Sequence, residues 1–174
     1  DFFTVACRTG DEDSGMTGIS LLLLEKGMPG IRVRKMKTQF DSTHGTTFIN
    51  LEDVKVPVRN LIGQEGLGFL YIVHNFNHER FVIASAASRA ARLCYELAFE
   101  ESLSRETFGK PLVKHQLIRF KLAEMARQIE SLYSLLEATA YQFKVGVKDF
   151  SMGQQCALLK VQASKVFEYC SREA

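Results

Sequence analysis

Residues 66–116 decide the fold of this chain, and they read GLGFLYIVHNFNHERFVIASAASRAARLCYELAFEESLSRETFGKPLVKHQ. Apolar side chains recur here in steps of three and four, which places them on one face of a helix. We therefore predict a helix over residues 67–104 whose apolar stripe packs into a core. The stripe consists of Phe69, Val73, Phe76, Arg80, Ile83, Ala87, Ala90, Cys94 and Leu97.

Two charged residues interrupt this stripe. Arg80 falls in register with the hydrophobic residues, and Glu79 has Phe76 three residues before it and Ile83 four residues after it. Burying either charge without a partner is costly, so each is expected to have a partner or a function. One interpretation is a buried or rim ion pair that only stabilises helix packing. The other is a functional pair beside a poorly solvated cleft.

A second polar cluster follows where the helical pattern stops, between Arg105 and Pro111. Gly109 and Pro111 end the helix, and His115 and Gln116 begin the next periodic run. Basic side chains at such a corner can hold an anion such as a phosphate. They can equally form a solvated turn that complements the helix dipole.

The rest of the chain predicts strands first and helices afterwards. Residues 1 to about 60 contain apolar runs such as FFTVAC and ISLLLLEK, separated by the Gly-rich segment GDEDSGMTG, as in an antiparallel sheet or part of a barrel. Further helices are predicted over residues 113–145 and 153–174. The predicted fold is α+β, with a partial antiparallel β-barrel domain over residues 1–62 and an antiparallel α-helical bundle over residues 63–174.

The two later helices differ in how complete their apolar faces are. Sustained heptad-like spacing in the first of them predicts packing in a bundle. The last helix has an incomplete apolar surface, so we expect a fourth helix or a partner subunit to cover it. The predicted inward positions are Ile118, Leu122, Met125, Ile129, Leu132, Leu136, Ala140 and Phe143, and then Ala157, Val161, Ser164 and residues 166–170.

The composition excludes several functional classes. The chain has 174 residues, of which 46% are hydrophobic and 24% charged, and its net charge of +2 gives no reason to expect nucleic acid or an acidic membrane surface as a partner. No run of about 18 apolar residues is present, so no membrane span is expected. Four widely spaced cysteines fit reduced thiols of an intracellular protein better than disulfides or a metal site. They are Cys7, Cys94, Cys156 and Cys170.

Other polar residues are interpreted as surface. A basic set of side chains at positions 32–37 fits a solvated strand face better than a binding patch, and His44 is interpreted as a loop histidine. Because the sequence starts in a strand-like run and ends in a helical pattern, we expect it to be part of a longer protein. The basic set is Arg32, Arg34, Lys35 and Lys37.

Four runs resemble the acyl-CoA dehydrogenase family. NHERFVIASAASRAARLCYELA and SRETFGKPLVKHQLIRFKLAEMARQIE resemble its helical domain, and GISLLLLEKGMPGIRV and INLEDVKVPVRNLIGQEGLGF resemble its middle β domain and the entry to the helices; DSTHGTTF matches more loosely. The resemblance implies an FAD-dependent oxidoreductase of fatty acid or amino acid catabolism that introduces an α,β double bond into an acyl-CoA. Electron-transfer flavoprotein is the implied acceptor. The residues present here are expected to be inactive alone.

The resemblance also assigns catalytic and substrate-binding roles. Glu79, immediately before Arg80, stands where the isovaleryl and long-chain branches carry the catalytic base. In most members the base is instead a glutamate near the far C-terminal end, beyond Ala174, so both origins stay open. Asn77 and Arg80 match positions that contact the CoA part of the substrate. Removing a proton α to a thioester requires a carboxylate in a dry pocket.

By the same resemblance, Arg105 matches the arginine that reaches the FAD of a neighbouring subunit near its pyrophosphate. Thr107, His115 and Gln116 match further cofactor contacts, and Glu106 is expected to turn its side chain away from the phosphates. A site shared between subunits implies a homo-oligomer, a dimer or a tetramer. No metal is implied. The compartments open to such a protein are the mitochondrial matrix, the peroxisome and the bacterial cytoplasm.

Two alternatives share the fold. The first is an acyl-CoA oxidase, which differs in how oxygen reaches the reduced flavin. The second is a non-catalytic helical assembly module. The joint presence of Glu79, Arg80, Arg105 and Gln116 favours an enzyme over such a module.

Overall fold

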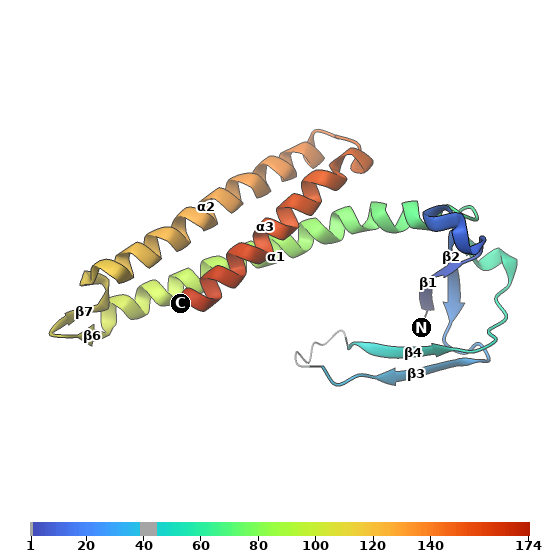
Figure 1. Cartoon of the computed structure of the whole chain (residues 1–174), viewed down its shortest axis with the longest axis horizontal. Coiled ribbons are helices and arrows are strands. Elements are labelled where there is room, and N and C mark those ends of the chain that lie inside the picture. Colours follow the sequence, from blue (N-terminus) through green and yellow to red (C-terminus); the bar gives the residue numbers. More distant parts are fainter. Residues whose placement is uncertain (1, 39–44) are drawn as a thin grey trace. The chain divides into compact units, whose positions relative to one another are not determined.

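The structure is a computed structural model that describes residues 2–38 and 45–174. The predicted α+β class is confirmed, since antiparallel sheets come first and three long helices follow (Figure 1). The chain divides into two compact units, Asp1–Ile72 and Val73–Ala174. The first residues of the first long helix therefore group with the strands, and the division at residues 62 and 63 stays a prediction.

A three-stranded antiparallel sheet organises the first unit. Its strands are β1 (Phe2–Arg8), β2 (Ile19–Glu25) and β5 (Leu61–Ile62), in the order β1-β2-β5. A 3-10 segment over Glu12–Gly18 joins β1 to β2. The buried Ser20 hydroxyl accepts a hydrogen bond from the N–H of Gly66 at 2.9 Å. This bond ties the glycine-rich joint to the middle strand.

A separate hairpin, β3 (Ile31–Lys35) and β4 (Thr47–Leu51), completes the first unit's strands, with Ile31 opposite Leu51. Its residues are almost all exposed. Arg32 pairs with Glu52 at 3.5 Å, and the Arg34 guanidinium lies 5.6 Å from the centre of the Phe48 ring. The basic set is therefore solvated, as predicted. His44 lies outside the described residues.

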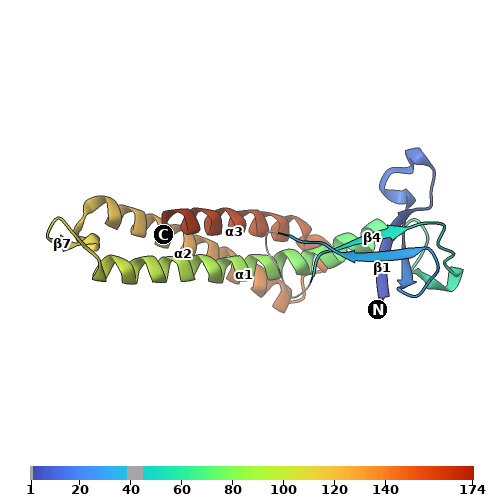
Figure 2. The same ribbon diagram turned by 90° about the horizontal axis from the view of Figure 1, so that it is seen from below.

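Three helices make up most of the second unit, and Figure 2 shows them lying side by side along much of their length. They are α1 (Gly68–Ser104), α2 (Gln116–Lys144) and α3 (Gly153–Glu173). The predicted helices over 67–104, 113–145 and 153–174 are thus confirmed to within a few residues. The two-residue strands β6 (Glu106–Thr107) and β7 (Lys110–Pro111) form a short hairpin between α1 and α2.

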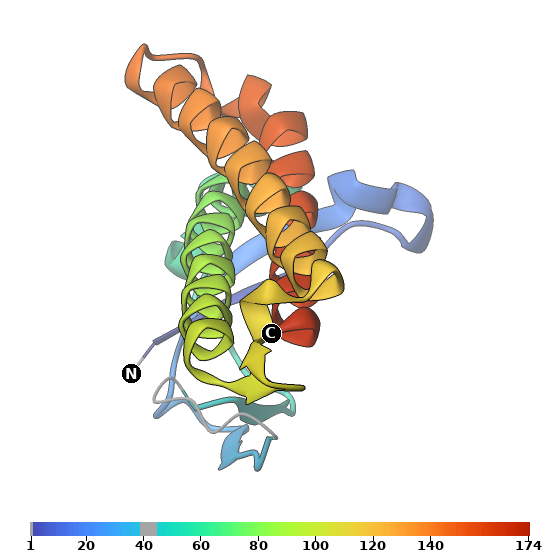
Figure 3. The same cartoon turned by 90° about the vertical axis from the view of Figure 1, so that its left-hand side faces the viewer.

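The core of the second unit takes side chains from all three helices, which Figure 3 shows foreshortened. The stripe predicted for α2 is largely confirmed, because Leu122, Met125, Ile129 and Leu132 are buried; only Ala140 is exposed. The positions predicted for α3 are confirmed at Val166 and Cys170, which are buried, whereas Val161 is exposed. The buried residues of α3 are Cys156, Leu159, Ala163, Val166 and Cys170.

The predicted stripe of α1 is only partly confirmed, because Ala87 and Cys94 pack against the core but the fully buried positions lie further round the helix. The buried positions Asn77, Ala84, Ser88 and Ala91 are mostly small residues. Small side chains let helix axes approach closely, so size rather than hydrophobicity selects the inward face. The larger apolar residues predicted to be inward are exposed instead. They are Phe76, Ile83 and Leu97.

Candidate functional site

Three predicted site residues lie within one turn of α1 but face different surroundings. Asn77 is buried, with 0% of its surface exposed, and a side chain at Gly153 of α3 would meet its amide at 3.6 Å. Arg80 is half-buried and Glu79 is exposed. Because a helix turns by about 100° per residue, residues adjacent in sequence point in different directions. The substrate contact of Asn77 stays a prediction.

Glu79 and Arg80 each interact with a residue of their own helix. Asn75 Nδ2 donates a hydrogen bond to Glu79 Oε1 at 2.5 Å, and the Arg80 guanidinium lies 5.8 Å from the centre of the Phe76 ring. In the part of the chain that the structure describes, no ion pair joins Glu79 to Arg80. The interpretation of the two as a buried ion pair is therefore wrong.

The expectation that two apolar neighbours exclude water from Glu79 is also wrong for the residues present. Phe76 is 41% exposed and Ile83 is 47% exposed. Both lie on the outer side of α1, because the inward face is one position further round. A dry environment for Glu79 would therefore require cover from other parts of the protein or from a partner.

The corner between α1 and α2 is a tight hairpin. Thr107 pairs with Lys110, and the two residues between them, Phe108 and Gly109, have positive φ angles of 52° and 74°. Positive φ at both central positions is typical of a type I′ turn. A non-glycine residue with this φ is uncommon, and Phe108 is also 96% exposed. No role was predicted for Phe108 from the sequence, although its place before Gly109 after a helix end was a signal.

His115 ties this hairpin to the start of α2. Its Nε2 lies 3.2 Å from Thr107 Oγ1 and 3.3 Å from the Thr107 carbonyl oxygen. The Phe108 ring meets the His115 ring edge-on, with centroids 6.2 Å apart. The N–H of Leu112 donates to the Arg105 carbonyl at 2.9 Å. The structure therefore brings Arg105, Thr107 and His115 into one locally bonded corner.

The corner offers hydrogen-bond donors to solvent. Arg105 and Gln116 are exposed, and His115 does not cap α2 with its side chain, so the first N–H groups of that helix are open. A guanidinium, a hydroxyl and a helix N-terminus are groups that bind phosphate. Glu106 is exposed, and strand alternation places it on the opposite side of the hairpin from Thr107. The residues present therefore fit a phosphate-bearing group at this corner.

The two predicted clusters lie far apart within one chain. Glu79 and Arg105 are separated by nearly the whole remaining length of α1, which ends at Ser104. At a rise of about 1.5 Å per residue, that separation is roughly 35–40 Å. One reacting centre therefore cannot be in contact with both clusters of the same chain.

A third polar cluster lies along α2, and the nearby ion pair of Lys121 with Glu173 links α2 to α3. Arg127 Nε donates to Glu124 Oε2 at 2.8 Å, a second guanidinium N–H of Arg127 donates to Glu124 Oε1, and Gln128 donates to the same carboxylate at 3.0 Å. These bonds lower the pKa of Glu124 to about 2. Lys121 pairs with Glu173 at 2.6 Å, and this hydrogen bond raises the pKa of the lysine.

The four cysteines carry thiols rather than disulfide bonds, and Cys156 and Cys170 are buried. Burial, with a smaller contribution from Cys94, raises the pKa of Cys170 to about 11. A thiol with a raised pKa carries little thiolate at neutral pH and is a poor nucleophile. Among the described residues, no group of three or more His, Cys, Asp or Glu side chains could hold a metal ion.

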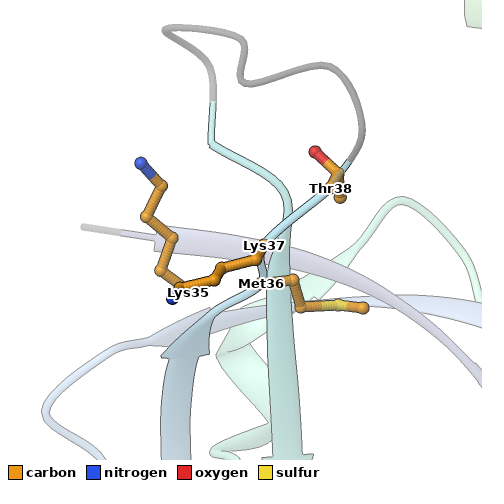
Figure 4. A pocket seen from close by; sticks show the side chains of 4 residues that line it. All are labelled: Lys35, Met36, Lys37 and Thr38. Atoms are coloured by element: carbon orange, nitrogen blue, oxygen red, sulfur yellow. The ribbon is translucent and has the colours of Figure 1, made fainter.

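Two cavities are large enough to compare with ligand sites. The first, of about 160 Å³, is lined by Arg105 and by residues of the three helices. This volume is small for a cofactor, so a ligand at the corner would bind on the exposed hairpin. Another, of about 450 Å³, is lined by Lys35, Met36, Lys37 and Thr38 beside the solvated hairpin (Figure 4). Neither contains Glu79. No helix in the described part of the chain combines the length and the hydropathy needed to cross a membrane.

Sequence comparison connects these features to known proteins. A family model described as acyl-CoA dehydrogenase, C-terminal domain, matches residues 66–174. The chain is 40% identical to the acyl-CoA dehydrogenase AFT10-1 of Alternaria alternata, covering 100% of this chain and 41% of that protein. It is 32% identical to mitochondrial isobutyryl-CoA dehydrogenase of Bos taurus, covering 99% of this chain and 41% of that protein.

Structural comparison agrees. The structure of butyryl-CoA dehydrogenase from Megasphaera elsdenii superposes with a TM-score of 0.82 at 34% sequence identity, over 95% of this chain and 43% of that one. The present chain thus spans about two fifths of the length of the curated relatives it matches. Features of these relatives that lie outside the shared region have no counterpart in the residues described.

Proposed function

The chain belongs to the acyl-CoA dehydrogenase family, and we propose that the whole protein is an FAD-dependent enzyme that oxidises an acyl-CoA to its α,β-unsaturated product. The observation that carries the proposal is the corner at Arg105, Thr107 and His115. Its hydrogen bonds fix the hairpin backbone and join Thr107 to His115, beside the exposed Arg105 guanidinium and the open N-terminus of α2. A helical module without a ligand would have no physical need for this arrangement.

Within this proposal, Glu79 is the base that removes the α proton of the thioester. The exposed carboxylate can reach a ligand that lies along the outer side of α1, and the Arg80 guanidinium beside it supplies positive charge for the phosphates of CoA. Covering this face when the protein is complete would remove water and favour proton abstraction. Asn77 keeps its predicted substrate contact only if its buried amide turns outward.

The corner is proposed to bind FAD. Arg105 would form charge-assisted hydrogen bonds to the pyrophosphate, with Thr107, His115 and Gln116 lining the same edge. The exposed ring of Phe108 stands beside them and can stack on a planar group. When bound, FAD would accept the hydride that leaves the β carbon.

The separation of the two clusters supports a site built from two copies of the chain. A flavin gripped by Arg105 of one copy would then lie beside Glu79 of another, and the protein would be a homo-oligomer, a dimer or a tetramer. The exposed apolar side chains of α1 and α3, such as Ile83 and Phe167, offer surface for such contacts. Electron-transfer flavoprotein is the proposed electron acceptor, and the compartment is the mitochondrial matrix, the peroxisome or the bacterial cytoplasm.

The test uses the full-length protein. Purified with FAD and then washed, it should stay yellow, and the flavin absorbance should bleach without oxygen when the correct acyl-CoA from a panel of chain lengths and branches is added. A protein that stays colourless is the result expected of a non-catalytic module and would overturn the proposal. Rapid recolouring in air would instead identify an acyl-CoA oxidase.

A further inference from the structure

A pair of histidines on α1 lies next to the proposed catalytic residues, with His78 immediately before Glu79, but neither histidine belongs to the proposed catalytic or cofactor set. His74 and His78 are four residues apart in one helix, so they lie one turn apart on the same face. Both side chains are exposed. Their ring centroids are 5.9 Å apart, and the ring planes meet at 70°. The two imidazoles therefore already face a common space outside the helix.

The aromatic residues around this pair restrict one of its rings. Phe143 of α2 stacks on His78 with centroids 5.6 Å apart and an interplanar angle of 28°. Phe81 packs against the same Phe143 ring; the two rings meet edge-on, with centroids 5.5 Å apart. A ring fixed in this way loses less rotational freedom when it binds a ligand, which favours binding.

We propose that His74 and His78 form a two-imidazole site for a divalent transition-metal ion of the Zn²⁺, Ni²⁺ and Cu²⁺ group. Imidazole nitrogen is a preferred ligand of these ions, and a helix carrying histidines at i and i+4 presents both to one ion. With metal–nitrogen bonds of about 2.0–2.1 Å, two rings on one ion have centroids roughly 5 Å apart. A small side-chain rotation from the observed 5.9 Å reaches that distance.

The site takes an ion without enclosing it. The described residues offer no group of three His, Cys, Asp or Glu side chains, so water or an external ligand fills the remaining positions. The ion is therefore exchangeable, and its affinity should follow the order in which Cu²⁺ binds more tightly than Ni²⁺ or Zn²⁺. The proposal does not depend on the enzymatic activity of the protein.

The test is a metal titration of the full-length protein by calorimetry, with NiCl₂ as the probe and no other ligand. Wild-type protein should bind one Ni²⁺ ion per chain at this site. His78→Ala and His74→Ala should each weaken the affinity for that ion by roughly 10- to 100-fold. His115→Ala is the matched control, because His115 lies at the other end of the unit, bonded to Thr107. It should bind as wild type does.

The two outcomes are distinct. Equal binding by wild type and His78→Ala, or loss of the same ion in His115→Ala, would overturn the site. Circular dichroism checks that the helices are intact; since both histidines are exposed, their removal should leave helix content unchanged. Phe143→Leu keeps an apolar residue but removes the stacked ring, and it should weaken nickel binding only a few-fold.

Discussion

The two ends of the helical unit hold their functional residues in different ways. At the corner, Thr107 bonds to His115 and the Leu112 N–H donates to the Arg105 carbonyl, so these bonded residues are at most eight positions apart. At the other end, Glu79 accepts a hydrogen bond from Asn75 of its own helix, and the Arg80 guanidinium lies 5.8 Å from the centre of the Phe76 ring. The hydrogen bonds of the corner lie within this chain. The exposed Glu79 side chain, in contrast, is accessible to other parts of the protein or to a partner.

The difference shows what kind of interaction determines each site. Short-range hydrogen bonds and two positive φ angles determine the corner, so its geometry follows from about a dozen residues. The surroundings of Glu79 depend on parts of the protein distant in sequence or on another copy of the chain. Mutations should therefore act on cofactor binding at the first end and on the chemical step at the second.

The largest effect is expected from Glu79→Gln in the full-length protein. The substitution keeps the shape but removes the base, so the rate of anaerobic flavin bleaching by acyl-CoA should fall by roughly 10²- to 10⁴-fold. Stopped-flow absorbance measures this rate, and the flavin content should stay as in wild type. Bleaching at the wild-type rate would assign the base to a different residue of the protein.

Arg105→Ala should act on the other end and on binding. Loss of a charge-assisted hydrogen bond to a phosphate costs about 1.5–3 kcal/mol, which corresponds to roughly 10- to 100-fold weaker FAD binding. Equilibrium fluorescence titration of the apoprotein measures this change. Lys110→Ala is the control, since that exposed cation lies in the same hairpin, and it should weaken FAD binding less. An equal loss of FAD affinity in both variants would show that the overall positive charge of the hairpin, and not a specific bond from Arg105, binds the cofactor.

A third pair of variants compares the buried and the exposed side of α1. Ala91→Leu places three extra carbons at a position with no exposed surface and should cost about 1–3 kcal/mol of folding free energy. Ala86→Leu is the matched control at an exposed position and should change stability little. Thermal unfolding of the full-length protein compares them. If Ala86→Leu were the more damaging change, something large would cover that face.

The smallest effect concerns the cluster of Glu124, Arg127 and Gln128 on α2. Hydrogen bonds from Arg127 and then Gln128 hold the pKa of Glu124 at about 2, below its ordinary value of 4.5. The folded state therefore binds this proton less readily, so the stabilisation is complete above pH 4.5 and is lost as the pH falls toward 2. Glu124→Gln should flatten that part of the stability–pH curve. An unchanged curve would show that the exposed pair contributes nothing measurable.

The sequence predicted the helices and the corner because their signals are local. Gly109 and Pro111 end a helix by their own backbone properties, and the periodic run from Leu122 to Leu132 fits only one buried face. The inward face of α1 was missed because this helix is apolar on most sides, so two adjacent registers fit the pattern equally. The inward face carries the small residues Ala84, Ser88 and Ala91 because three helices pack closely there. The pattern of one helix does not reveal where the other two helices pack against it.

The surroundings of Glu79 could not be predicted for a related reason. Phe76 and Ile83 flank it in sequence, yet both are exposed in the described structure. Hydrophobic neighbours three or four residues away exclude water only if another element packs on the same face. The type I′ turn at Phe108 was missed as well, because a phenylalanine with positive φ runs against the usual preference for Asn or Gly.

The central claim is that one reaction uses Glu79 from one copy of the chain and Arg105 from another. Co-expressed Glu79→Gln and Arg105→Ala chains test it most directly, assayed at an FAD concentration that leaves the Arg105→Ala homo-oligomer empty. Random pairing gives each mixed dimer one intact site, so acyl-CoA oxidation should return to roughly a quarter of the wild-type activity. Activity no greater than the sum of the two separate variants would contradict the claim.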